Sequence, residues 1–224
     1  MMEYKIKTYE EAIKVIEEIG LLPLAPLIAD YPSLGSITEP GAWHSDTEFD
    51  PWNWRIKFST DGVAGYGKFI KKKSILVSRQ LLPYVKIVLG LNESVKERYF
   101  KGNISKEARD LYEIISQEEG IDTRVLRSRA GLREKEQKKL FDRGLLELQG
   151  SMDIVISGIK EKVSEDGEKK GWSSTAFETY DSWATRNNIE TIYLSKEEAR
   201  DHLMIHFSNI CGPELVKKIA KIFR

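Results

Sequence analysis

Three tryptophans and three acidic residues crowd into the stretch AWHSDTEFDPWNWR, residues 42–55. Glycosyl and phosphoryl transfer both use paired carboxylates, so Asp46, Glu48 and Asp50 are candidates for the acid and the base of an enzyme. The surrounding aromatic side chains could stack a base that has been flipped out of a nucleic acid. The candidate pocket is formed by Trp43, Asp50, Trp52, Trp54, Arg55, Tyr66 and Lys68.

The same stretch also fits a purely structural role. Asp50 precedes Pro51, an order typical of an N-cap followed by the first turn of a helix. Trp52 and Trp54 would then anchor that helix, because tryptophan mostly serves packing, and Arg55 could pair with an acid. We favour this structural interpretation over the catalytic one.

A second cluster, this one basic, lies between residues 124 and 143. The whole chain of 224 residues carries 35 basic and 35 acidic side chains, so this excess of positive charge is local. Local clusters of this kind bind the phosphates of nucleic acids, whereas the alternative is a solvated helix face with pairs such as Glu134 with Lys138. We favour nucleic-acid contact, through Arg124, Arg127, Arg129, Arg133, Lys135, Lys138 and Lys139.

The elements that carry the basic cluster follow a specific order. Ser105 caps a predicted helix that runs to Glu119, Asp122 caps a short helix over 123–130, and a third helix covers 133–149. A strand over 151–161, a polar turn at 164–171 and a strand over 172–180 come next. This order predicts a winged helix-turn-helix, whose third helix enters the major groove of DNA. Many winged helices bind protein instead, so the order alone does not decide the partner.

The first half must support this domain. Thr8 and Glu11 form a capping box for a helix that Gly20 ends. The proline-rich segment 21–41 forbids a regular helix and is apolar enough to pack over the core. Strands over 62–70 and 74–79 form a hairpin with a basic tip, Lys71, Lys72 and Lys73, and Ser78 caps a helix over 79–89. Contact of these lysines with a DNA backbone is the less favoured use of the tip.

These patterns predict an α+β protein. Its parts are an N-terminal region (1–100) that holds the tryptophan cluster and the hairpin, a winged-helix domain (101–194) and a C-terminal helical pair (195–224). The charged stretch over 90–103 marks the first boundary. Ser195 with Glu198 and then Pro213 start the last two helices.

Other classes of function find little support in the sequence. No apolar run approaches the roughly 18 residues that a membrane span needs, and no signal-peptide pattern opens the chain. A lone cysteine, Cys211, suits the reducing cytoplasm. His202 and His206 share a helix face, but Leu203 stands where a metalloprotease helix has glutamate, so we expect neither a metal nor a cofactor.

The segments GLLPLA, DPWNWR, GYGKF, VSRQLLPY and GWSSTAFETYDSW, in this order, resemble a family related to the AlkZ-type DNA glycosylases, over nearly the whole chain. AlkZ-type enzymes are built from tandem winged helices and cleave the glycosidic bond of damaged, crosslinked bases. The resemblance therefore implies DNA as the partner and a context of DNA repair.

One departure from the AlkZ-type pattern concerns the chemistry. Those enzymes carry a catalytic glutamine-x-glutamine or glutamine-x-aspartate motif, and Pro23 and Ala25 of GLLPLA stand at the corresponding positions. Neither side chain can orient water. We therefore expect a winged-helix DNA-binding protein without the usual glycosylase activity. The alternatives are a repair enzyme that uses the acids of the tryptophan-rich segment, and a protein-interaction module.

Overall fold

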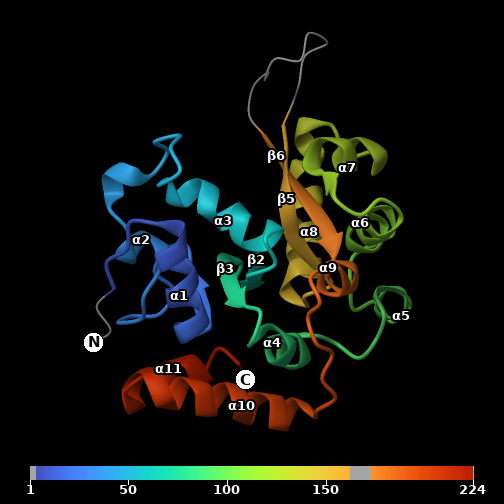
Figure 1. Ribbon diagram of the computed structural model, residues 1–224. Helices are drawn as coiled ribbons and strands as arrows, with labels where there is room; N and C mark the ends of the chain where they lie inside the picture. The colour runs from blue at the N-terminus through green and yellow to red at the C-terminus, as the bar shows by residue number, and fades with distance from the viewer. Residues whose placement is uncertain (1–3, 162–172, 224) are drawn as a thin grey trace.

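The computed structural model describes residues 4–161 and 173–223 and combines helices with two small antiparallel sheets (Figure 1). The chain therefore has the mixed α and β architecture that the sequence predicts. The strands are β1 (Leu21–Pro23), β2 (Ala64–Ile70), β3 (Lys73–Ser78), β4 (Ile121–Asp122), β5 (Ile154–Lys160) and β6 (Ser174–Thr179). They are ordered β1-β3-β2 in one sheet and β4-β6-β5 in the other.

Capping residues fix both ends of the first helix, α1 (Tyr9–Ile19). The Thr8 hydroxyl accepts the Glu11 backbone N–H at 3.2 Å, and a Glu11 carboxylate oxygen accepts the Thr8 N–H at 3.2 Å. Gly20 ends the helix at a φ of 75°, in the left-handed region that glycine tolerates. The predicted capping box and stop are thus confirmed.

The proline-rich segment packs over the core, as predicted, but it is not wholly irregular. β1 comes from this segment, and Tyr31 donates its hydroxyl to the carbonyls of Ile19 and Leu21 at 3.1 and 2.8 Å. The expectation of no regular helix was wrong over four residues: Ser33 caps the short helix α2 (Leu34–Ile37) between two prolines. The 3-10 turn η1 (Pro40–Ala42) and helix α3 (Pro51–Thr60) follow.

The predicted hairpin is β2 and β3, and helix α4 (Leu82–Leu89) follows it. Two details differ from expectation. Lys73 is the first residue of β3, so the turn itself is Lys71 and Lys72. Ser78 does not cap α4 directly, because its hydroxyl accepts the Leu81 N–H at 3.3 Å and forms a turn that precedes the helix.

The charged stretch after α4 contains a helix that the sequence analysis missed, α5 (Val95–Phe100), with Ser94 and Glu97 as its capping box. Its Arg98 is buried, and the guanidinium donates to Asp153 at 2.6 Å and to Ser151 at 3.1 Å. This charged stretch is therefore not only a solvated linker, because one of its residues, Arg98, forms an ion pair inside the protein.

The second half has the predicted order of helices and strands. Its helices are α6 (Lys106–Gln117), α7 (Thr123–Arg129) and α8 (Lys138–Gly150), with the 3-10 turn η2 (Lys135–Gln137) before α8. The third helix thus starts five residues later than predicted, at Lys138. The short strand β4 was not predicted, and it pairs Ile121 with Phe177 of β6. The polar turn predicted at 164–171 lies outside the described residues.

The chain ends with α9 (Tyr180–Arg186), which was not predicted, and with the two expected helices α10 (Lys196–Ile210) and α11 (Pro213–Ala220). In Figure 1, α10 and α11 run along the lower side of the molecule, and α10 packs against α4. Among the described residues, no helix is long and apolar enough to cross a membrane.

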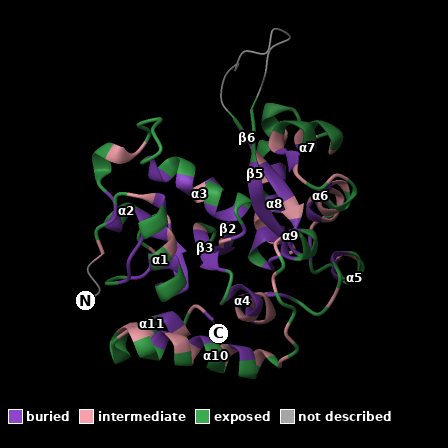
Figure 2. Cartoon of the chain, viewed as in Figure 1, coloured by how far each residue is buried: buried purple, intermediate pink, exposed green. Residues whose placement is uncertain are grey.

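Buried residues line the inner faces of both halves (Figure 2). They form two hydrophobic clusters, and each cluster draws residues from before and after residue 100. Trp183 illustrates the connection, because its indole N–H donates to the Ser59 carbonyl at 3.1 Å. The supporting half and the basic half therefore hold each other in a fixed relation.

Candidate functional site

The basic segment, residues 124–139, forms α7, the turn after it, η2 and the first residues of α8. Asp122 starts α7 by accepting the Arg124 backbone N–H at 2.9 Å. After α7 the chain turns at Gly131, whose φ of 68° lies in the left-handed region. All seven predicted cations lie on this one stretch, but their environments differ.

Arg127 organises the turn between α7 and α8. Its guanidinium donates to the carbonyls of Leu132 (3.1 Å), Arg133 (3.2 Å) and Glu134 (3.2 Å), and it lies 5.5 Å from the ring centroid of Phe141. The five N–H donors of a guanidinium form a rigid fork that can bind several carbonyls at once. A lysine ammonium group is a poor substitute for this fork. Arg127 is therefore a structural brace that holds the neighbouring cations in place.

Three further cations of the basic segment are paired with acids. Arg124 contacts Asp122 at 3.3 Å, Arg129 contacts Glu118 at 2.6 Å, and Lys138 contacts Asp142 at 3.0 Å. The pairs of Arg129 and Lys138 are exposed, and such pairs contribute little free energy, at most about 1 kcal/mol. A stronger anion such as a phosphate can therefore replace the carboxylate of Glu118 or Asp142 at low cost. Asp122 differs, because it is buried and caps α7.

The remaining three, Arg133, Lys135 and Lys139, are exposed. Their side chains form no ion pair or hydrogen bond with any residue that the structure describes. They lie in the turn before α8 and in its first residues, next to the exposed acids Glu134 and Glu136, so this end of the basic segment carries three unpaired cations.

The second half of α8 is covered by the rest of the protein. Gly144 packs so closely that a β-carbon there would lie 2.9 Å from Leu111 Cδ1 and 3.1 Å from the Ala108 nitrogen. Gln149 is buried, and its side-chain carbonyl accepts the Lys68 backbone N–H at 2.9 Å. One face of the second half of α8 is therefore closed to a large partner, whereas Lys138 and Lys139 at its beginning are exposed.

The tryptophan-rich segment is built around Asp50, which is 1% exposed. Its carboxylate accepts backbone N–H groups from Trp52 (2.9 Å), His44 (3.0 Å) and Asp46 (3.3 Å). It caps α3, as the structural interpretation of the sequence predicted, and it also fixes the loop before the helix. Its carboxylate therefore holds the backbone of this segment together.

The three tryptophans have separate roles. Trp43 donates to the Thr38 hydroxyl at 2.9 Å, and the buried Trp54 donates to the Glu48 carbonyl at 2.7 Å. Trp52 is 38% exposed, and the Arg55 guanidinium stacks 3.4 Å from its ring centroid. Arg55 donates to the Trp52 carbonyl rather than to an acid.

The candidate pocket residues do not line one cavity. Trp54 lines an apolar cavity of about 330 Å³ together with Phe49, whereas Lys68 lines a different cavity of about 380 Å³ beside α8. Tyr66 lies in the sheet, where burial raises its pKa, and burial also lowers the pKa of Arg55. Asp46 and Glu48 are exposed on the loop before α3.

The segment GLLPLA forms the end of α1 and the strand β1. Pro23 is buried and pairs with Ile75 of β3, and Ala25 is exposed just after the strand. Neither residue has a polar side chain that could hold a water molecule.

A family model described as AlkZ related matches residues 6–224 of the chain. The chain belongs to the AlkZ-related family. The match spans β1, the tryptophan-rich segment and the basic segment together, so all three belong to one family pattern. No curated protein and no solved structure matches the chain.

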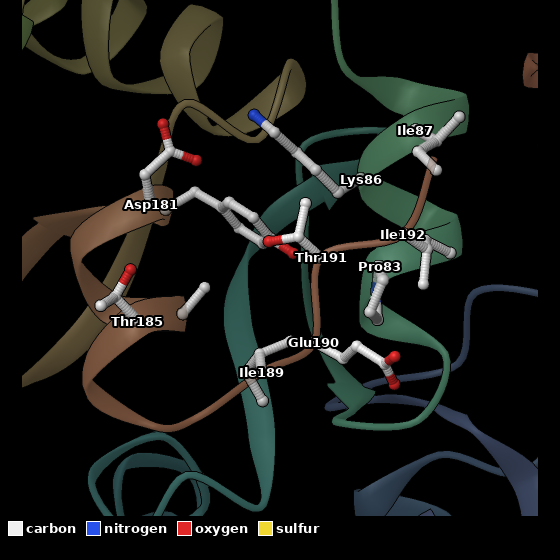
Figure 3. Close-up of a pocket in the computed structure, with 11 residues that line it drawn as sticks. Pro83, Lys86, Ile87, Asp181, Thr185, Ile189, Glu190, Thr191 and Ile192 are labelled. Atoms are coloured by element: carbon white, nitrogen blue, oxygen red, sulfur yellow. The ribbon is translucent and has the colours of Figure 1, made fainter. Parts of the chain in front are cut away.

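This AlkZ-related protein also has a cleft that the sequence analysis did not single out. Cavities of about 350 and 520 Å³ are both lined by Lys86 and Asp181. In Figure 3, Lys86 points from α4 toward the side of the first cavity that carries Asp181. Its ammonium group donates to the Met152 carbonyl at 2.7 Å, and burial lowers its pKa. A single lysine in the apolar run LLPYVKIVL is the sequence signal that could have revealed it.

The histidines and the cysteine of the AlkZ-related chain do not converge on a metal site. His202 is exposed beside the Tyr84 ring, at 4.9 Å between ring centroids, and His206 Nε2 is buried without a partner among the described residues. Cys211 is half-buried, which raises its pKa. Within the described residues, no three histidine, cysteine or acidic side chains are grouped so that they could hold a metal ion.

Proposed function

We propose that this AlkZ-related protein binds duplex DNA through a winged helix formed by α6, β4, α7, α8, β5 and β6. The order of these elements and the β4-β6-β5 sheet support this assignment. In a winged helix the first residues of the third helix contact the bases. Here the first residues of α8 are exposed and basic, whereas Gly144 and Gln149 pack against the rest of the protein, which supports the same orientation.

The observation that carries the proposal is the set of exposed, unpaired cations Arg133, Lys135 and Lys139. Each cation that neutralises a DNA phosphate releases condensed counterions, so affinity falls as salt rises. The paired cations Arg129 and Lys138 add phosphate contacts when their weak, exposed carboxylate partners are displaced, and Arg124 adds one without leaving the buried Asp122. Arg127 contributes through the shape of the turn rather than through direct contact.

We further propose that the protein does not cleave glycosidic bonds by the AlkZ-type route. Pro23 and Ala25 stand where the AlkZ-type motif has its polar residues, and neither can orient a water molecule or stabilise a developing positive charge. Asp50 does not replace this motif, because it is committed to three backbone N–H groups, and Asp46 and Glu48 lie exposed on the loop before α3.

The test of DNA binding is fluorescence anisotropy with a labelled duplex of about 20 base pairs, two helical turns, across a salt series. The variant Arg133→Ala, Lys135→Ala, Lys139→Ala removes three contacts. Its slope of log affinity against log salt should be shallower by about 2.7, at about 0.9 per phosphate. The matched control, Lys5→Ala, Lys14→Ala, Lys221→Ala, removes the same charge from exposed positions elsewhere and should leave the slope unchanged.

Two outcomes contradict the proposal. If the unaltered protein does not bind duplex DNA at low salt, the basic segment is a solvated surface. If the control variant reduces the slope as much as the Arg133, Lys135, Lys139 variant does, the attraction to DNA is diffuse and the winged helix has no special role. Release of a base from alkylated duplex DNA by the unaltered protein would overturn the proposed absence of glycosylase activity.

A further inference from the structure

The turn between β2 and β3 has an unusual sequence for its conformation. Lys71 and Lys72 occupy the two central positions, between the paired residues Ile70 and Lys73, and their φ angles are 49° and 59°. A two-residue turn with both φ angles positive is a type I′ turn, which strongly favours Asn-Gly. Lysine at both positions is unfavourable, because the β-carbon crowds the backbone in the left-handed region. Conformation alone therefore does not explain the two lysines.

The charges at this turn are uncompensated. Lys71, Lys72 and Lys73 are exposed, and their ammonium groups form no ion pair or hydrogen bond within the described part of the chain. Three adjacent positive charges repel one another, which adds to the cost of the backbone conformation. Backbone strain that persists in a folded protein is often associated with a functional position.

The hairpin lies beside the basic segment and is fixed to it. Lys68 of β2 and Lys138 of α8 line the same cavity of about 380 Å³. The Lys68 backbone N–H donates to the side-chain carbonyl of Gln149 in α8 at 2.9 Å. This bond and the shared cavity place β2 along α8, so the hairpin keeps a constant position relative to that helix. The Lys68 side chain is exposed beside the cavity that Lys138 also lines.

We propose that the β2–β3 hairpin is a second phosphate-binding element, which contacts the sugar–phosphate backbone of the duplex bound by α8. Lys71, Lys72 and Lys73 make these contacts, and Lys68 connects them with the contacts of Lys138 and Lys139. This inference rests on the proposed DNA binding and extends its interface from the second half of the chain to the first. Phosphate contacts of this kind fix the orientation of a protein on DNA and carry no sequence preference.

The double variant Lys71→Asn, Lys72→Gly separates the effect of the lysine charges on binding from any effect on folding. Asn-Gly suits the type I′ turn, so the variant should melt at a higher temperature than the unaltered protein. It also removes two phosphate contacts, so the salt dependence of duplex binding should be shallower by about 1.8. A gain in stability together with a loss of binding cannot result from unfolding. Adding Lys73→Gln should reduce the slope by about a further 0.9.

A comparison with the Arg133, Lys135, Lys139 variant distinguishes failure of the hairpin inference from failure of the proposed DNA binding. If Arg133→Ala, Lys135→Ala, Lys139→Ala reduces the slope and Lys71→Asn, Lys72→Gly does not, the hairpin inference is wrong and DNA binding by α8 stands. If the unaltered protein does not bind duplex DNA, both fail. A matched control, Lys5→Asn, Lys14→Asn, removes two exposed charges away from the hairpin and should leave the slope unchanged. An equal loss in this control would overturn the hairpin assignment.

Discussion

The side-chain carbonyl of Gln149 accepts the backbone N–H of Lys68 at 2.9 Å, across 81 positions of sequence. The same side chain donates its amide N–H to the Leu145 carbonyl at 3.1 Å, so both of its polar ends are used. This one buried amide ties the hairpin of the first half to the third helix of the second. It sets the relative position of the two basic surfaces that we propose contact DNA.

Replacing Gln149 by leucine should destabilise the fold and loosen the hairpin. The Lys68 N–H would lose its partner in a partly buried position, at a cost of about 1–3 kcal/mol in the free energy of unfolding. Urea unfolding measures this loss. Gln117→Leu, at an exposed position at the end of α6, is the control and should change stability by less than about 0.5 kcal/mol. Equal effects of the two substitutions would contradict a specific role for the bond.

Asp50 should prove essential for the loop and helix of the tryptophan-rich segment. Asp50→Ala removes the cap of α3 and leaves the backbone N–H groups of His44 and Asp46 without their acceptor. A lost cap alone costs about 1 kcal/mol, and Asp50→Asn should cost less because one acceptor oxygen remains. Thermal unfolding provides the measurement. Glu48→Ala, an exposed acid on the same loop, should have almost no effect, and a large effect there would argue against our account.

Arg127→Lys tests whether this residue acts as a brace or as a DNA contact. The substitution keeps the charge but loses the fork that binds the carbonyls of residues 132–134. Stability should fall by about 1.5–3 kcal/mol, which corresponds to the net loss of one hydrogen bond from a charged donor. Duplex affinity should weaken with the salt slope unchanged. A shallower slope would instead identify Arg127 as a direct phosphate contact. The control Arg129→Lys, in an exposed pair with Glu118, should leave stability nearly unchanged.

Features with a local cause were predictable from the sequence. The capping box of Thr8 and Glu11, the cap at Asp122 and the stops at Gly20 and Gly131 each depend on residues within a single turn. The missed helix α5 had the same kind of signal, Ser94 with Glu97, but its charged composition suggested a boundary. Its Arg98 is charged yet buried because Asp153, 55 positions away, lies opposite it.

The division of the basic segment into paired and free cations could not be predicted. Arg129 is paired because the fold brings α6 and its Glu118 beside α7, and Arg127 is engaged because the chain doubles back after Gly131. The late start of α8 has the same origin, since the carbonyls just before η2 bind Arg127 and the chain there is not helical. Sequence indicates where positive charge gathers, and tertiary contacts decide which charges remain available.

Lys86 should make the stability of the protein depend on pH in alkaline solution. Burial lowers its pKa in the folded state below the ordinary value of 10.5. Below the folded-state pKa, the ammonium group is charged in both states and burial carries a constant cost. Between the folded-state pKa and 10.5, the unfolded chain binds more protons than the folded chain, so stability rises with pH.

The variant Lys86→Met isolates this contribution, because it keeps the length of the side chain and cannot titrate. The free energy of unfolding of the unaltered protein minus that of the variant should increase as pH rises toward 10.5. Urea unfolding of both proteins at matched pH values measures the difference, and the other titrating groups cancel in the subtraction. A constant difference would mean that the Lys86 pKa is the same in both states. A decreasing one would mean that Asp153 and Asp181, which favour the charged form, outweigh burial.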